Sequence, residues 1–245
     1  MHVQVQINDG VAIVTLHDPD TRNAITLRLV DELETALTGL ASHPQVKALV
    51  ITGAGTAFCS GADRKVLQDA DEKSLRVIYQ AFIAVRNFPL PTVAAVNGPA
   101  VGAGLNLALA CDIRVAAESA VFDSRFVNIP IPPGGGHAWM LHHSTQAQTA
   151  AAMSLFGVPV DGRRAADIGL AWRCVPAHLL MSTVAEICAD VRRAPRELLV
   201  KVKASIRSTS LVPTHAEAVE AELACQVRHL LEAGPLSGDN GRSSN

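Results

Sequence analysis

The chain has 245 residues, of which 49% are hydrophobic and 18% are charged, so it can bury one large core, and we expect one main domain. Its formal net charge of -2 gives no global reason to bind nucleic acid or an anionic membrane, since both need a concentrated basic face. No window reaches the ~18 uninterrupted apolar residues of a membrane-spanning helix, and no basic stretch leads into an apolar run at the N-terminus.

The cysteines indicate a reducing compartment. Cys59, Cys111, Cys174, Cys188 and Cys225 form no paired short spacing of the kind that zinc ribbons or redox dithiols use. We therefore expect a cytoplasmic protein without a bound metal and without a redox cofactor.

Strand and helix patterns alternate over the first half of the chain. Two runs rich in valine and isoleucine, 11–16 and 46–52, predict strands, and apolar residues at helical spacing over 29–40 predict a helix between them. A second round follows, with a helix over 75–86, a strand over 92–96, a short helix from Leu105 and a strand over 113–116. This alternation favours an α/β fold.

The pattern after Gly136 is helical for most of the remaining length. Pro159, Pro176, Pro195 and Pro213 are expected to begin or separate helices. We predict a core over residues 1–190, a helical region over 191–235 and a frayed tail over 236–245, because the tail is rich in glycine, serine and asparagine.

Two glycine-rich segments, 53–63 and 96–106, each follow a predicted strand, and the second leads into a helix. Small residues there allow a ligand to approach the backbone, and amides at the start of a helix point outward. One alternative is a nucleotide-phosphate cradle, but Leu107 stands at the third position of the dinucleotide fingerprint and no Gly-Lys-Ser/Thr is present. Another is a pair of tight turns without a ligand.

Taken together, several segments resemble the crotonase (enoyl-CoA hydratase/isomerase) superfamily. They occur in the order that the superfamily has, and the resemblance covers about residues 10–210. The segments are Arg22-Asn23-Ala24, Phe58 to Asp63, Asn97 to Gly104, Cys111-Asp112-Ile113, Pro133-Gly134-Gly135-Gly136 and Ala165 to Leu170.

The resemblance implies a crotonase-like spiral of ββα units with a helical C-terminal region, assembled as a homotrimer or homohexamer. It also implies an acyl-CoA thioester as ligand, so that coenzyme A enters with the substrate and not as a separate cofactor. The thioester oxygen is expected between the backbone amides of Ala62 and Ala103, since two preorganised donors stabilise a developing oxyanion.

The same resemblance implies positions that line the coenzyme A moiety, with Arg22, Arg64 or Lys65 as candidates to meet phosphate. The positions are Arg22, Asn23, Ala24, Ala62, Asp63, Lys65, Gly102 and Ala103.

The chain departs from the superfamily at both acids of a standard hydratase. The positions of the two glutamates are occupied by Asn106 and Phe126, neither of which exchanges a proton. A positioned acid or base contributes about 10²- to 10⁴-fold, so we do not expect efficient hydration.

Two residues are candidates to replace these acids. His137 stands at the start of a predicted helix, where the helix dipole disfavours its protonated form and leaves a neutral base. Asp123 is the second candidate. The alternatives are a structural histidine at a helix terminus and an Asp123 that pairs with Arg125. Cys59 is expected to be a small buried hydrophobic residue and not a nucleophile.

These observations favour an acyl-CoA-processing enzyme, enoyl-CoA hydratase/isomerase-like, that stabilises a thioester oxyanion or enolate with backbone amides. An alternative is a non-catalytic acyl-CoA binding protein on the same scaffold, which Asn106 and Phe126 favour and which Asp123 and His137 oppose. A third hypothesis is an interaction subunit that no longer binds coenzyme A.

Overall fold

The computed structural model describes residues 1–68, 71–129, 131–210 and 212–233. The chain divides into two compact units, Met1–Arg193 and Ala194–Asn245. The tail predicted over 236–245 lies outside the described residues. Among those that are described, no helix is long and apolar enough to cross a membrane.

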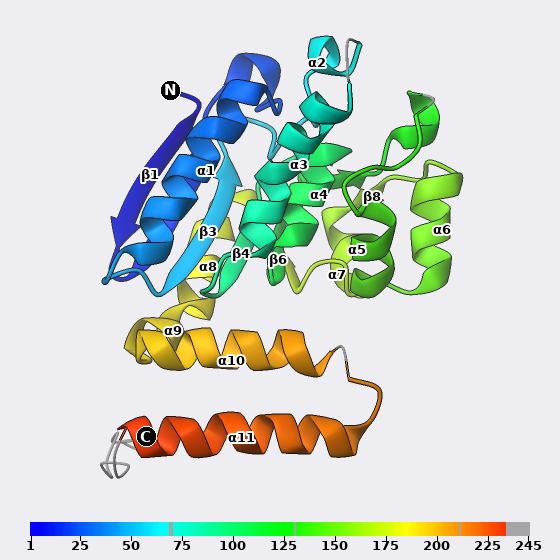
Figure 1. The fold of residues 1–245 in the computed structure, drawn as a ribbon. Coiled ribbons are helices and arrows are strands. Elements are labelled where there is room, and N and C mark those ends of the chain that lie inside the picture. The colour runs from blue at the N-terminus through cyan, green and yellow to red at the C-terminus, as the bar shows by residue number, and fades with distance from the viewer. Residues whose placement is uncertain (69–70, 130, 211, 234–245) are drawn as a thin grey trace. The chain divides into compact units, whose positions relative to one another are not determined.

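Unit 1 is built around a six-stranded sheet of order β1-β2-β3-β4-β6-β9 (Figure 1). Only β1 runs antiparallel to its neighbour, and every other pair in this sheet is parallel. The strands are β1 (Val3–Asn8), β2 (Val11–Leu16), β3 (Ala48–Gly53), β4 (Thr92–Val96), β6 (Ile113–Ala117) and β9 (Arg173–Val175). The predicted α/β class is confirmed, with an interior of strands that are apolar on both faces, as parallel sheets require.

The sequence prediction missed β1, although a hairpin pattern is present. Val3, Val5 and Ile7 alternate with polar residues, and Asp9 and Gly10 both have positive φ, of 48° and 77°. This is the backbone of a two-residue turn that joins antiparallel strands. β1 is an edge strand with one buried residue, so its apolar signal is weak.

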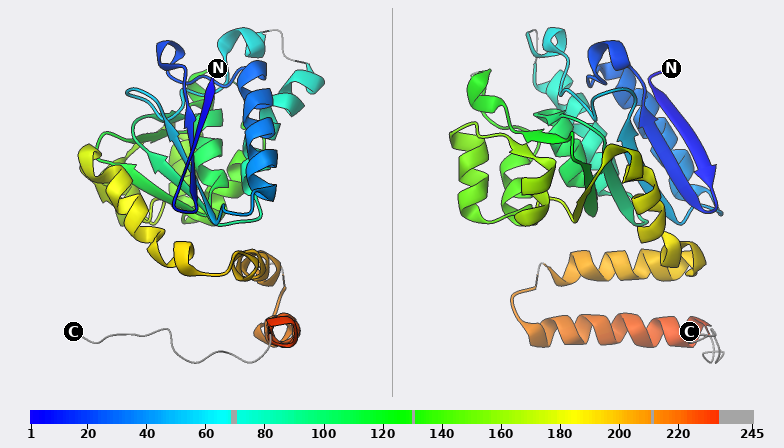
Figure 2. Two further views of the ribbon diagram at one scale, coloured as in Figure 1. Left: turned by 90° about the vertical axis from the view of Figure 1, so that its left-hand side faces the viewer. Right: turned by 180° about the vertical axis from the view of Figure 1, so that it is seen from behind.

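Helices cover both faces of the sheet. α1 (Leu27–Ser42) and α3 (Glu72–Arg86) pack together on one face, and α8 (Leu180–Ile187) lies on the other, as the views in Figure 2 show. Leu180 and Val184 of α8 pack against a row of small strand residues that includes Val50 and Val93. The spacing of four residues between them places both on the face of α8 that meets the sheet.

A second, three-stranded sheet of order β5-β7-β8 consists of β5 (Ala100–Val101), β7 (Val121–Asp123) and β8 (Val160–Asp161). The sequence prediction missed these short strands, and it also missed β9 within a stretch that it treated as helical. The other helices of unit 1 are α2 (Arg64–Gln68), α4 (Ala103–Ala110), α5 (His137–Ser144), α6 (Ala147–Leu155), α7 (Gly162–Asp167) and α9 (Ala189–Arg193), with 3-10 turns η1 (Pro19–Thr21), η2 (Phe126–Asn128) and η3 (Ala177–Leu179).

Unit 2 contains a pair of helices, α10 (Arg196–Thr209) and α11 (His215–Ala233), that pack against each other. Pro195 directly precedes α10, where its fixed φ suits a helix start. The predicted helical C-terminal region is therefore confirmed.

Candidate active site

The two glycine-rich segments lie against each other, backbone to backbone. The amides of Phe58 and Cys59 both donate to Pro99 O at 3.1 Å, and the amide of Val101 donates to Cys59 O at 3.0 Å. A Cβ added at Gly104 would stand 2.2 Å from Cys59 O, closer than any real side chain is found. Glycine is required here because the neighbouring backbone occupies the space of a side chain.

This packing brings the two predicted oxyanion donors close together. An ideal Cβ built on Gly61, the residue before Ala62, would lie 3.8 Å from the amide nitrogen of Ala103. Both alanines are half-buried.

Neither amide has an acceptor within the part of the chain that the structure describes. Ala62 is bridged to Ile25, whose partners are Gly61 O at 2.8 Å and the amide of Asp63 at 3.0 Å, so the N–H of Ala62 faces away from that bridge. Ala103 is the first residue of α4, where the helix offers no carbonyl to its amide. Gly102 precedes it with φ of 52°, a value that favours glycine.

A buried chain of hydrogen bonds begins on α4, one turn after Ala103. Asn106 donates through Nδ2 to Gly134 O at 3.1 Å, and its Oδ1 lies 2.7 Å from His137 Nδ1. His137 Nε2 lies 3.0 Å from Ser124 Oγ. Asn106, His137 and Ser124 are 2%, 1% and 1% exposed.

The partners fix the tautomer of His137. Since Nδ2 of Asn106 donates to a carbonyl, its Oδ1 is the acceptor that faces the imidazole, and Nδ1 therefore carries the ring proton. Nε2 is then an acceptor, and the hydroxyl of Ser124 donates to it. Burial lowers the pKa of His137 from 6.5 to about 4, so the ring is neutral near neutral pH.

This burial predicts a dependence of stability on pH. The unfolded chain takes up a proton at His137 below its ordinary pKa of 6.5, whereas the folded chain resists protonation down to about 4. The stabilisation that comes from a neutral His137 is therefore fully present above pH 6.5 and is lost as the pH falls from 6.5 to about 4. We expect the free energy of unfolding to drop by about 2 kcal/mol from this residue between about pH 7 and about pH 5.

Urea unfolding at both pH values measures this drop in wild type and in His137→Gln, which has no ring to protonate and should lose that part of the pH dependence. The exposed His178 supplies the control, since His178→Gln should leave the drop unchanged. An identical pH dependence in wild type and His137→Gln would show that the buried imidazole is not responsible.

The structure brings three predicted site residues together. Phe126 is 8% exposed, and its ring meets that of His137 edge-on with centroids 4.8 Å apart. His137 also binds Asn106, so it contacts both residues that stand where the resemblance implies glutamates. The apolar ring of Phe126 is buried against His137 and excludes water from that side of the imidazole.

Asp123 forms an ion pair with Arg125, two residues further along the chain. One of its carboxylate oxygens, Oδ2, lies 2.8 Å from Arg125 Nε and 2.6 Å from a terminal nitrogen of the same guanidinium. The other, Oδ1, is buried without a hydrogen-bond partner among the described residues. The carbonyl of Asp123 accepts from the Gly102 amide at 2.8 Å, which connects β7 to the turn before Ala103.

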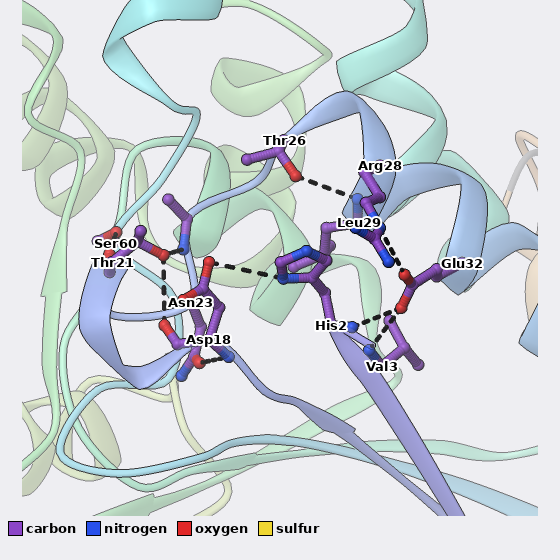
Figure 3. Close-up of polar contacts among 11 residues, drawn as sticks. His2, Val3, Asp18, Thr21, Asn23, Thr26, Arg28, Leu29, Glu32 and Ser60 are labelled. Carbon is purple, nitrogen blue, oxygen red and sulfur yellow. Dashed lines mark hydrogen bonds and ion pairs between the residues drawn. The ribbon is translucent and has the colours of Figure 1, made fainter.

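The predicted coenzyme A positions lie around the Ala62 turn. Asn23 is fully buried, and its Nδ2 lies within 3.3 Å of the carbonyls of Ala54, Ala57 and Phe58. Its Oδ1 accepts from the Asp18 amide, as Figure 3 shows. The side chain of Asn23 therefore holds the backbone of the first glycine-rich segment in place through its carbonyl groups. The cationic side chains of Arg22, Arg64 and Lys65 are exposed, and Asp63 accepts from the Lys65 amide at 2.7 Å.

Cys59 is a buried apolar residue, and a cavity lies next to the loop that precedes His137. Cys59 is fully buried, and burial raises the pKa of its thiol to about 12, so it does not supply a thiolate. A cavity of about 190 Å³ is lined by Gly135, Gly136, Trp139 and Met140 together with residues of α3. Its lining includes the loop whose Gly134 carbonyl binds Asn106.

Sequence reasoning missed Ser124 as a functional candidate. No local pattern marks this serine, because its hydrogen-bond partner His137 lies 13 residues further along the chain, in another element.

Comparisons with known proteins identify the family of the chain. Residues 6–233 match the family model for enoyl-CoA hydratase/isomerase. The chain is 42% identical over 237 residues to a protein named probable enoyl-CoA hydratase EchA14 of Mycobacterium tuberculosis, which covers 95% of this chain and 90% of that protein. A probable enoyl-CoA hydratase of Rhodobacter capsulatus is 34% identical over 90% of this chain and 87% of its own.

Solved structures give the same result for the fold. A probable enoyl-CoA hydratase/isomerase from Mycobacterium abscessus superposes with a TM-score of 0.86 at 28% identity, covering 94% of this chain and 91% of that one. An enoyl-CoA hydratase from Bacillus anthracis superposes with a TM-score of 0.87 at 26% identity, covering 95% and 97%.

Proposed function

Because the chain belongs to the enoyl-CoA hydratase/isomerase family of the crotonase superfamily, an acyl-CoA-processing family, we propose that it binds an acyl-CoA thioester and polarises its carbonyl with the Ala62 and Ala103 amides. The acyl group would then lie near Asn106, His137 and Phe126. Reaction would proceed through an oxyanion or enolate held by these two donors.

The observation that carries this proposal is the pair of adjacent backbone amides without an acceptor among the described residues. Amides that have no partner within the protein, such as those at the start of a helix, are available to a ligand oxygen. A ligand oxygen between Ala62 and Ala103 would satisfy both donors at once. Arg64 and Lys65 follow the Ala62 turn in the sequence, and Arg22 O accepts from the Ser60 amide at 2.9 Å just before it. The exposed cationic side chains of these three residues are suited to coenzyme A phosphates.

A second candidate function is a non-catalytic acyl-CoA binding protein. Asn106 and Phe126 favour it, because neither side chain can move a proton to or from an acyl group. His137 opposes it, since a neutral imidazole with an acceptor nitrogen is a base. Both candidates share the bound thioester and differ in turnover.

Calorimetric titration with two ligands tests the shared part. Butyryl-CoA has the thioester carbonyl, whereas S-butyl-CoA is a thioether that lacks it and keeps every phosphate. We expect butyryl-CoA to bind about tenfold tighter or more, because each amide bond is worth about 0.5 to 1.5 kcal/mol. Equal affinities would refute the proposed hole, and failure of both ligands to bind would favour the interaction-subunit hypothesis.

We also propose a homotrimer or homohexamer, by resemblance to the superfamily. Light scattering coupled to size exclusion measures the mass of the assembly, and a monomer would contradict this expectation.

A further inference from the structure

Three side chains from three separate elements form one directed hydrogen-bond chain. Asn106 lies on α4, Ser124 follows β7, and His137 is the first residue of α5. The Ser124 hydroxyl donates to Nε2 of His137, and Nδ1–H of His137 donates to Oδ1 of Asn106. This is the order of nucleophile, base and orienting group that activates a serine.

The hydrogen-bond chain ends at Ser124, beside the proposed oxyanion hole. β7 pairs with β5 so that Asp123 is in register with Val101, and the Gly102 amide donates to Asp123 O at 2.8 Å. Asp123 and Gly102 are thus joined by a hydrogen bond. Ser124 directly follows Asp123, and Ala103 directly follows Gly102. The serine and one oxyanion donor are thus held by the same pair of strands.

We propose that Ser124 is a nucleophile and that the protein hydrolyses an acyl-CoA thioester through an acyl-Ser124 intermediate; this inference rests on the function proposed above. Ser124 Oγ forms a bond to the thioester carbonyl carbon while its proton passes to His137 Nε2. The carbon–sulfur bond then breaks, and coenzyme A leaves as a thiol with that proton. Water next forms a bond to the carbonyl carbon of the acyl-serine ester and loses a proton to His137. The ester bond to Ser124 Oγ then breaks and Oγ takes that proton, so the products are a carboxylic acid and free Ser124.

The leaving group suits the weakness of the base. Asn106 carries no charge to stabilise an imidazolium, and burial holds the pKa of His137 at about 4. A thiol has a pKa near ~8.5, so the carbon–sulfur bond breaks readily to a thiolate, which then takes the proton from His137. A thioester is therefore a substrate class that a neutral Ser-His-Asn set can process, whereas an amide needs its nitrogen protonated.

The orienting bond is also secured. When an asparagine replaces the aspartate of a serine triad, the wrong histidine tautomer can result and turnover falls by about 10⁴-fold. Here Gly134 O ties the Nδ2 group of Asn106 and leaves only Oδ1 for the imidazole. Asn106 is therefore a positioning residue that keeps Nε2 free to accept the proton of Ser124.

Butyryl-CoA is the probe for this reaction, with release of coenzyme A followed by a thiol reagent and acyl transfer followed by intact-protein and peptide mass. Wild type should release coenzyme A and carry one butyryl group on Ser124. Ser124→Ala should lose the adduct and lower the release at least ~10²-fold, while it still prefers butyryl-CoA over S-butyl-CoA in binding. Ser119→Ala, which changes an exposed serine bound to Asn97 O, should behave as wild type.

Each failure has a distinct meaning. Ser124 is 1% exposed, so a wild type that prefers the thioester but gives neither an adduct nor free coenzyme A would show that the acyl group does not reach Oγ, and the nucleophile proposal falls alone. Release that persists in Ser124→Ala would also overturn it. Loss of the thioester preference in Ser124→Ala, which does not consume butyryl-CoA during the titration, would refute the proposed hole itself. Should Ser124→Ala fail to fold, Ser124→Cys replaces it, and that thiol should collect the butyryl group.

Discussion

Replacing Ala103 with proline is expected to lower the turnover of an acyl-CoA thioester by about 10²- to 10³-fold, because one donor of an oxyanion hole is typically worth that much. The substitution removes one N–H and leaves the carbonyl in place. Ala103 is the first residue of α4, the helix position that tolerates proline best, and its amide makes no bond to the described chain. The preference for butyryl-CoA over S-butyl-CoA should weaken in parallel.

A matched control is available on α6. Ala147 is also the first residue of its helix, it is exposed, and Gln146 before it has extended φ and ψ of -80° and 153°. Ala147→Pro therefore makes the same chemical change away from the proposed hole and should leave turnover and binding unchanged. Thermal unfolding of both variants checks that they fold. An Ala103→Pro protein that is folded and fully active would remove that amide from the mechanism.

The glycine-rich turns could be predicted from the sequence because their causes are local. Small residues directly after a strand permit the close approach that Gly104 makes to Cys59 O, and the start of a helix leaves its first amides unpaired. Asn23 is buried against the glycine-rich segment 53–63, because its side-chain amide donates to the carbonyls of Ala57 and Phe58. Such features need only a few neighbouring residues to be recognised.

The polar chain through His137 could not be predicted in the same way. Asn106, Ser124 and His137 come from elements whose meeting depends on how the short sheet β5-β7-β8 pairs, and strands of two or three residues have no reliable periodicity. The two hypotheses about Asp123 also needed coordinates, and the structure shows the ion pair with Arg125 that one of them names. Side-chain partners at long sequence separation are thus the part of the site that local patterns leave open.

The last prediction concerns Asn106 and Phe126, the two positions where the resemblance to the superfamily implies glutamates. Wild type should hydrate crotonyl-CoA near background, because Asn106 cannot ionise and Phe126 fills the second position with a buried ring. Asn106→Glu combined with Phe126→Glu should raise hydration at least ~10²-fold if the oxyanion hole is intact, since a positioned acid or base contributes about that much. Hydration is followed by the mass of the hydroxyacyl-CoA product, because hydrolysis of the thioester would also remove the absorbance of the conjugated enoyl thioester.

The matched control is Asn106→Gln with Phe126→Gln, which has side chains of the same length as glutamate but no group that exchanges a proton. It should stay at background, and a gain equal to that of the glutamate pair would show that the effect comes from space and not from acid–base chemistry. Two buried carboxyl groups beside His137 cost stability, so thermal unfolding of both double variants is measured in parallel. Wild-type hydration at a rate typical of enzymes, on the order of 10 s⁻¹, would contradict the whole account of the missing acids. His137→Ala would then be the decisive variant, because a histidine that replaces them must lower turnover while butyryl-CoA still binds.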